Sequence, residues 1–146
     1  MMRNVKEVQK AFAYITNGAR LLVFEHADFP DAGLQVPAGT IQPGEIPEAA
    51  ALREATEETG LLRFSNVRFL ATTHFDARPA GKDERHVRHF FQLETLSPVP
   101  EAWRHHERHG NDALTAAIAF DLYWLSWSEA ARRLAHGHGE FVQCLR

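Results

Sequence analysis

The chain has 146 residues, of which 45% are hydrophobic and 24% charged, and its formal net charge is −3 at pH 7. This composition is typical of globular proteins and excludes disorder of the whole chain. The length predicts one domain over residues 1–146, with a core large enough to be stable without disulfides. Lysines and arginines are scattered, so no basic block indicates a nucleic-acid partner.

The sequence contains a single cysteine, Cys144, which excludes both an intramolecular disulfide and a cysteine metal cluster. The opening residues Met-Met-Arg-Asn-Val-Lys-Glu have no apolar core, so we expect no signal peptide. No apolar run approaches the ~18 residues that a membrane span needs. We therefore expect a cytoplasmic protein without a membrane partner.

The N-terminal third predicts a β-hairpin. Residues 5–15 alternate loosely between apolar and polar and indicate a strand, Asn17-Gly18 is a strong hairpin turn signal, and Leu21–Phe24 returns as a second strand. Three further segments are predicted to be a loop, a short strand and a loop shaped by two prolines and two glycines, in the order Asp28–Gly33, Leu34–Val36 and Pro37–Gly44.

The clearest helix is predicted over Pro47–Thr59. Pro47 suits the first helical position, Glu48 suits the positive end of the helix dipole, and Gly60 suits the stop. Ile46, which precedes the helix, has no side-chain oxygen with which to cap it.

The second half predicts further strands and a final helix. Val67–Phe75 and Val87–Leu93 indicate strands joined by a polar loop, whereas residues 97–112 contain two prolines and three histidines and are expected to be irregular. Phe120–Trp127 indicates a last strand, and Ser128 is expected to cap a helix that ends near Leu134. Hairpins followed by strand–helix units predict an α/β (α+β) domain with a mixed sheet.

The most informative stretch runs from Gly39 to Leu61 and reads GTIQPGEIPEAAALREATEETGL. It resembles the box of the Nudix family in register throughout. Seven positions of that box demand one residue type, and chance agreement at all seven is on the order of 10⁻⁸ per start point. The chain supplies all seven, together with aliphatic Ala55 and Leu61: Gly39, Glu45, Arg53, Glu54, Glu57, Glu58 and Gly60.

The resemblance implies an α/β/α sandwich with a central mixed sheet, and a hydrolase that cleaves a phosphoanhydride bond of a nucleoside diphosphate linked to another moiety. Ala55 is smaller than the aliphatic residue that the family prefers there, and Ile46 stands where many members have a serine or threonine cap. Neither departure affects the acidic residues.

The residues themselves point to a hard metal ion. Glu54, Glu57 and Glu58 are spaced i, i+3 and i+4, which places three carboxylates on one helix face at a cost of roughly 0.2–0.5 kcal/mol per pair. Two of them lie near the helix C-terminus, where the dipole disfavours anions by up to ~1 kcal/mol. A cation would relieve this repulsion, and oxygen ligands favour Mg²⁺ or Mn²⁺ over zinc or copper.

The resemblance also assigns roles to the box residues. Glu57 and Glu58 correspond to metal ligands, Glu54 to a ligand or to the base that activates water, and the carbonyl of Gly39 to a further ligand. Predicted catalytic residues are Glu54, Glu57 and Arg53, where Arg53 orients the glutamates. Glu45, as the ion-pair partner of Arg53, and Gly60 are expected to be structural.

Other interpretations stay open. The acidic face could be merely solvated, because a penalty of about 1–2 kcal/mol is tolerable in a folded domain. The chain could be a non-catalytic nucleotide sensor, although it keeps every box carboxylate. An isopentenyl diphosphate isomerase would need a pocket cysteine, and an RNA decapping enzyme would need a basic patch.

Residues outside the box give weaker signals. A further acidic ligand or base is expected first in the region 101–112, with five candidates in predicted loops: Asp83, Glu84, Glu101, Glu107 and Asp112. The histidines near it (His105, His106 and His109) are better read as a solvated loop, and His136-Gly137-His138 as a frayed helix end. Possible phosphate contacts are Arg78, Lys82, Arg85 and Arg88. Trp103 is a candidate for stacking a base, whereas Trp124 and Trp127 are expected in the core.

The substrate stays undetermined. Signatures of ADP-ribose and diadenosine polyphosphate hydrolases are missing at Asp76, Ala77 and Arg78. Nucleoside triphosphates, nucleotide sugars and dinucleotide polyphosphates all fit. A homodimer is also left open, since apolar N-terminal strand residues could lie at a two-fold interface.

Overall fold

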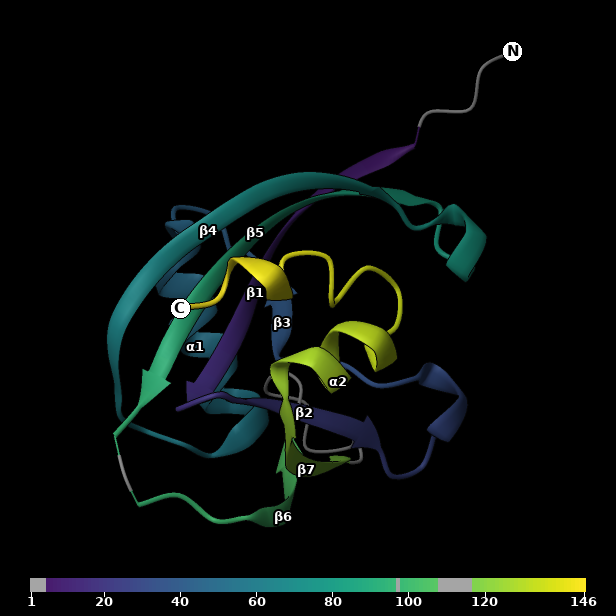
Figure 1. Cartoon of the computed structure of the whole chain (residues 1–146). Helices are drawn as coiled ribbons and strands as arrows, with labels where there is room; N and C mark the ends of the chain where they lie inside the picture. Colours follow the sequence, from purple (N-terminus) through teal and green to yellow (C-terminus); the bar gives the residue numbers. More distant parts are fainter. Residues whose placement is uncertain (1–4, 97, 108–116) are drawn as a thin grey trace.

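A computed structural model describes residues 5–96, 98–107 and 117–146 of the chain (Figure 1). Within these ranges no helix is long and apolar enough to cross a membrane. The strands are β1 (Lys6–Asn17), β2 (Arg20–His26), β3 (Ala38–Thr40), β4 (Phe64–Asp76), β5 (Glu84–Thr95), β6 (Ala102–Glu107) and β7 (Ile118–Ser126). The helices are α1 (Pro47–Thr59) and α2 (Trp127–Arg133), with short 3-10 turns η1 (Pro30–Ala32), η2 (Arg78–Ala80) and η3 (Val142–Cys144).

The strands form one mixed sheet in the order β4-β5-β1-β2-β7-β6, and β3 pairs with β1 off this path. β1 and β5 are parallel, whereas the other pairs are antiparallel. The predicted hairpin is confirmed, because Asn17 pairs with Arg20 across a two-residue turn in which Gly18 has a φ of +59°.

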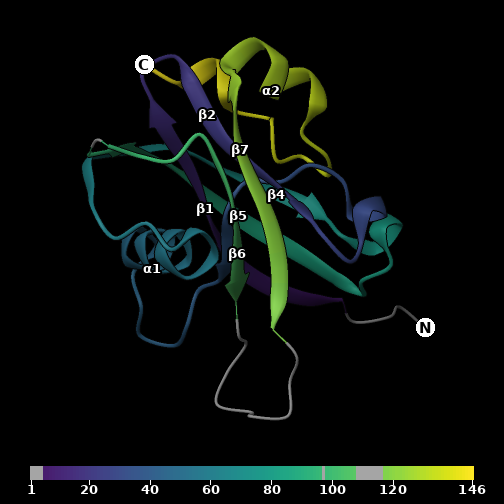
Figure 2. The same cartoon turned by 90° about the horizontal axis from the view of Figure 1, so that it is seen from below.

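Alternation along the central strands builds a core on each face of the sheet. In β1, Ala11, Ala13 and Ile15 belong to one buried cluster, whereas Phe12 and Tyr14 belong to the other. Helix α1 packs on the first face, and α2 with the C-terminal segment packs on the second, so the sheet lies between the helices (Figure 2). The predicted α/β/α sandwich is confirmed.

Helix α1 has the predicted bounds. Gly60 follows it in the left-handed conformation (φ 79°) and donates its N–H to Thr56, while Ile46 caps the start without a side-chain hydrogen bond. Three fully buried alanines, Ala50, Ala51 and Ala55, face the sheet. Small side chains there allow close approach of the helix, which accounts for Ala55 at a position where the family prefers a larger residue.

The prediction that residues 97–112 are irregular was wrong for residues 102–107, which form strand β6; residues 108–112 lie outside the described residues. β6 pairs antiparallel with β7 from Ala102 to Glu107. Its composition, Ala-Trp-Arg-His-His-Glu, has weak strand propensity. Pairing and packing against α1 decide its structure instead.

Smaller predictions also need correction. Leu34 and Gln35 make only isolated bridges, to Leu134 and Phe24, and part of the predicted 37–44 loop forms β3. Ser126 caps α2 in place of Ser128, by accepting a hydrogen bond from the Glu129 N–H. His138 does not lie in a frayed end, because its ring is buried and accepts a hydrogen bond from the Val36 N–H. Burial lowers the pKa of His138 to about 3.

Candidate active site

A cavity of about 840 Å³ opens between α1, β3 and the end of β6. Four glutamates and Arg53 line it, together with the glycine-containing stretch that forms β3. Lys10 from β1 and His106 from β6 complete its wall. The cavity therefore gathers side chains from segments nearly a hundred residues apart around one helix face.

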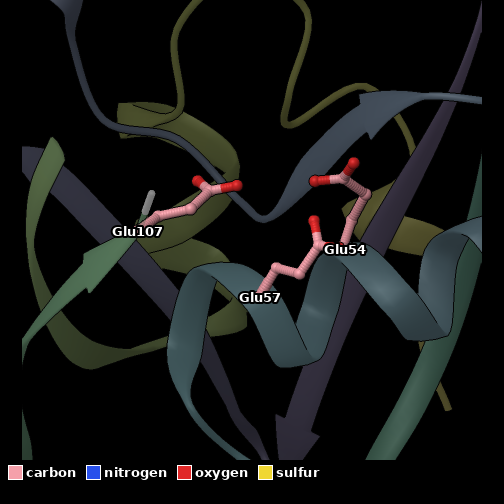
Figure 3. Close-up of side chains that lie close together, drawn as sticks. All are labelled: Glu54, Glu57 and Glu107. Carbon is pink, nitrogen blue, oxygen red and sulfur yellow. The ribbon is translucent and has the colours of Figure 1, made fainter. Parts of the chain in front are cut away.

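Three carboxylates meet in this cavity. One oxygen each of Glu54, Glu57 and Glu107 lies within 4.8 Å of the others. Figure 3 shows Glu54 and Glu57 rising from α1, with Glu107 reaching toward them from the end of β6. Glu58, the fourth glutamate of the cavity, is buried and accepts a 3.4 Å hydrogen bond from the Ala38 N–H. The sequence alone names Glu107 as one of five acidic candidates and favours the region 101–112 that contains it.

Arg53 connects the box residues. Its Nε and Nη2 donate to the two oxygens of Glu45 at 2.8 and 2.9 Å, and its Nη1 donates to Glu54 at 2.7 Å and to Glu57 at 3.2 Å. The pair with Arg53 lowers the pKa of Glu45 to about 2. A guanidinium that binds Glu45 as a fork has few remaining orientations, so it restricts the two acidic side chains that it also touches.

Gly39 lies directly against the carboxylate of Glu54. A Cβ at position 39 would overlap the carboxylate carbon and both oxygens of Glu54. Gly60 is constrained by its left-handed backbone and also by a neighbouring side chain, because a Cβ there would lie 3.0 Å from the His105 ring. Both box glycines thus leave space for a neighbouring side chain.

Burial raises the pKa of two glutamates in the site. The pKa of Glu58 lies well above its usual value because of burial and then the nearby charges of Glu107 and Glu54. Burial also raises the pKa of Glu54, although Arg53 opposes the shift. Clustered carboxylates with raised pKa values are stabilised in their charged form by a cation, and their hard oxygens suit Mg²⁺ or Mn²⁺.

Strand β6 is fastened to the end of α1. The Trp103 indole donates a 2.8 Å hydrogen bond to the Thr59 carbonyl, and a His105 ring nitrogen lies 2.9 Å from the Glu57 carbonyl oxygen. Trp103, His105 and Glu107 occupy every second position of the strand, so their side chains share the face that is turned toward α1. Trp103 packs against the core. The suggestion that it stacks a base therefore has no support in its packing.

Several other candidates lie outside this cavity. Glu101 pairs with Arg20 at 2.7 Å, Glu84 with His86 at 2.8 Å, and Arg78 with Asp76 at 2.7 Å. Trp124 is buried in the core on the α1 side of the sheet, and Trp127 packs against the core on the opposite side, as predicted. His109 and Asp112 lie outside the described residues.

A family model described as the NUDIX domain matches residues 7–145 of the chain. The chain belongs to the Nudix family. The box that the sequence analysis identified is thus part of a match that extends over almost the whole chain.

Known Nudix proteins resemble the chain in sequence and in structure. An ADP-ribose pyrophosphatase of Bacillus subtilis (strain 168) is 38% identical over 68 residues, which are 47% of this chain and 34% of that protein. The chain therefore spans about a third of that relative's length. A Nudix hydrolase from Nitrosomonas europaea is 26% identical with a TM-score of 0.64, covering 95% of this chain and 86% of that chain.

A MutT Nudix hydrolase from Burkholderia pseudomallei has a TM-score of 0.70 over 97% of this chain and 99% of that chain. Its sequence identity is 18%, so this likeness shows the fold alone. Together the comparisons show the Nudix family and fold, and they leave the substrate undetermined.

Proposed function

We propose that the chain forms one Nudix domain that hydrolyses a phosphoanhydride bond in a nucleoside diphosphate linked to another moiety, with Mg²⁺ or Mn²⁺ as cofactor. The observation that supports this most is the convergence of Glu54, Glu57 and Glu107 in one cavity. A set of carboxylate oxygens without sulfur or a described histidine ligand matches the preference of these ions.

The acidic residues of the cavity and Arg53 each have a role in the proposed reaction. Glu57 would hold the metal together with Glu58 and the Gly39 carbonyl, the ligands that the family resemblance implies. Glu54 or Glu107 would also hold it or accept the proton of the attacking water. When bound, the ion would neutralise diphosphate oxygens and make a water molecule more acidic. Attack of water on phosphorus forms one P–O bond, breaks the bridging P–O bond of the phosphoanhydride and releases two phosphorylated products, while Glu54 or Glu107 takes up the proton of the water. Arg53 keeps Glu54 and Glu57 in position throughout.

Lys10 supplies a positive charge to the same cavity. Its Nζ donates a 2.9 Å hydrogen bond to the Thr40 hydroxyl, beside Gly39. An ammonium group at that place suits a substrate phosphate oxygen, because four glutamates make the wall acidic and Arg53, its other cation, is already bound to Glu45 and Glu54. Lys10 was not among the residues that the sequence analysis identified.

The experiment measures phosphate or nucleotide release from a panel of nucleoside triphosphates, nucleotide sugars and dinucleotide polyphosphates, with Mg²⁺, Mn²⁺ or EDTA. The Glu57→Gln/Glu58→Gln double variant is expected to lose at least ~100-fold in kcat, about 2.7 kcal/mol of transition-state stabilisation. Glu48→Gln is the control, since Glu48 is an exposed glutamate of the first turn of the same helix.

A nucleotide sensor is the second candidate. It predicts nucleotide binding without turnover, independent of metal and unchanged in the double variant. That result on the whole panel would reject the hydrolase. An isomerase is disfavoured because it requires a catalytic cysteine in the pocket, whereas Cys144 is exposed and lines none of the described cavities.

A further inference from the structure

A second cavity adjoins the acidic one and has the opposite electrostatic character. It measures about 360 Å³ and shares Lys10, Ala38 and Gly39 with the first cavity, so the two meet at β1 and β3. Lys10, Lys82 and Arg88 contribute positive charge to it, and none of the described residues that line it is acidic. Phe12 and Phe75 form an apolar part of its wall.

Arg88 is the unusual residue of this cavity. Its side chain comes from the middle of β5 and the residue is 4% exposed. The guanidinium carbon lies 3.6 Å from the centre of the Phe75 ring and 4.8 Å from that of Phe12, so the cation is sandwiched near two aromatic rings.

The hydrogen-bond partners of Arg88 are uncharged. Nη1 donates to the His136 carbonyl at 2.6 Å, and Nε and Nη2 lie 3.3 and 3.2 Å from Nδ1 of His86. Burial lowers the pKa of His86, which keeps its ring neutral at pH 7. Glu84 ends this hydrogen-bond chain, because it contacts the far nitrogen of His86 and not the guanidinium.

No described carboxylate forms an ion pair with Arg88; the charge of Glu140 acts on the guanidinium from farther away and favours its cationic form. Burial lowers the pKa of Arg88 to about 10, so the side chain is still a cation at pH 7. Burial, and then the charge of Lys82, also lower the pKa of Lys10. Buried cations normally have an anionic partner, and here a ligand is the group that would supply it.

We propose that this second cavity binds a phosphate group of the substrate that is remote from the scissile diphosphate. Three cationic side chains favour a phosphate dianion as the ligand over a carboxylate, which has a single charge. The planar guanidinium of Arg88 can donate two hydrogen bonds to phosphate oxygens. The inference rests on the proposed function and narrows it to nucleoside-diphosphate compounds that carry an additional phosphate.

The test measures phosphate binding directly, without catalysis. Metal-free protein in EDTA is titrated with ribose 5-phosphate, with ribose as the neutral control, and backbone amide and Arg88 Nε signals are followed by NMR. We expect saturable shifts around β1, β5 and Lys82 with ribose 5-phosphate only. Arg88→Met should weaken binding at least about tenfold, the value of one charge-assisted hydrogen bond.

Two further variants keep the test decisive. Lys82→Ala removes an exposed side chain of the cavity and should weaken binding even if Arg88→Met fails to fold. Arg132→Ala removes the same charge from the exposed side of α2 and should bind like the wild type. Equal shifts with ribose, or equal affinities in Lys82→Ala and Arg132→Ala, would overturn the proposal. Because no metal or turnover is involved, neither result bears on the hydrolase itself.

Discussion

At the scale of single residues, the site depends on close packing around Gly39 and on the hydrogen bonds of Arg53. Gly39 is required because the Glu54 carboxylate occupies the volume that a side chain would fill. Arg53 satisfies Glu45 and two acidic side chains at once, so a shift of one partner moves the others. These contacts determine where each carboxylate lies. The helix spacing alone determines only that the α1 carboxylates share one face.

The first prediction concerns Gly39. Gly39→Ala is expected to displace the Glu54 carboxylate, reduce kcat at least ~10-fold and destabilise the protein by about 1–3 kcal/mol, as overpacking does. Gly44→Ala is the control from the segment that follows β3, because Gly44 has open space around it, although its φ of +79° makes alanine strained there. The control should lose only stability. Equal kcat losses in both would indicate a general disturbance of residues 38–44 and not overlap with Glu54.

At the scale of elements, β6 acts as the second wall of the site. Its alternation turns Trp103, His105 and Glu107 toward α1, and the first two contact backbone carbonyls of the last helical turn. The last four carbonyls of a helix have no partner within it, so these contacts both satisfy the helix end and hold the strand in register. Glu107 is positioned as a consequence.

The second prediction concerns Trp103. Trp103→Phe removes the N–H that Thr59 accepts and should cost about 1–2 kcal/mol of unfolding free energy, with a lower kcat as Glu107 loses its position. Trp127→Phe is the control, because the buried Trp127 Nε1 has no hydrogen-bond partner among the described residues. Urea denaturation of both variants measures the difference. If Trp127→Phe lowers the free energy of unfolding at least as much as Trp103→Phe does, the loss reflects the smaller ring and not the hydrogen bond to α1.

At the scale of the whole molecule, buried acidic groups oppose folding unless they are protonated or bound to a cation. The folded state raises the pKa of Glu58 and Glu54 above 4.5, so it binds protons more tightly than the unfolded chain does. Their contribution to stability is therefore fully present below about pH 4.5 and is lost as the pH rises through the raised values. A divalent ion compensates at high pH.

The third prediction follows from this linkage. Without metal, Glu58→Gln should be more stable than the wild type at pH 8, and the difference should vanish near pH 4.5. Mg²⁺ at 100 times its Kd should stabilise the wild type by about 2.7 kcal/mol at pH 8 and should do far less for the variant. Thermal unfolding with Mg²⁺ or EDTA at both pH values gives the four comparisons. An equal Mg²⁺ response in the two proteins would remove Glu58 from the ligand set.

The sequence by itself determined the family box, the bounds of α1 and the alternation that buries both faces of β1. These features follow from local rules: residue spacing, helix caps and the period of a strand. It named Glu107 only as one of five acidic candidates and Arg88 only as a possible phosphate contact, and it did not point to Lys10. Their positions depend on which strands are neighbours in the sheet, and β6 becomes a strand only through β7 and α1, contacts that no local pattern encodes.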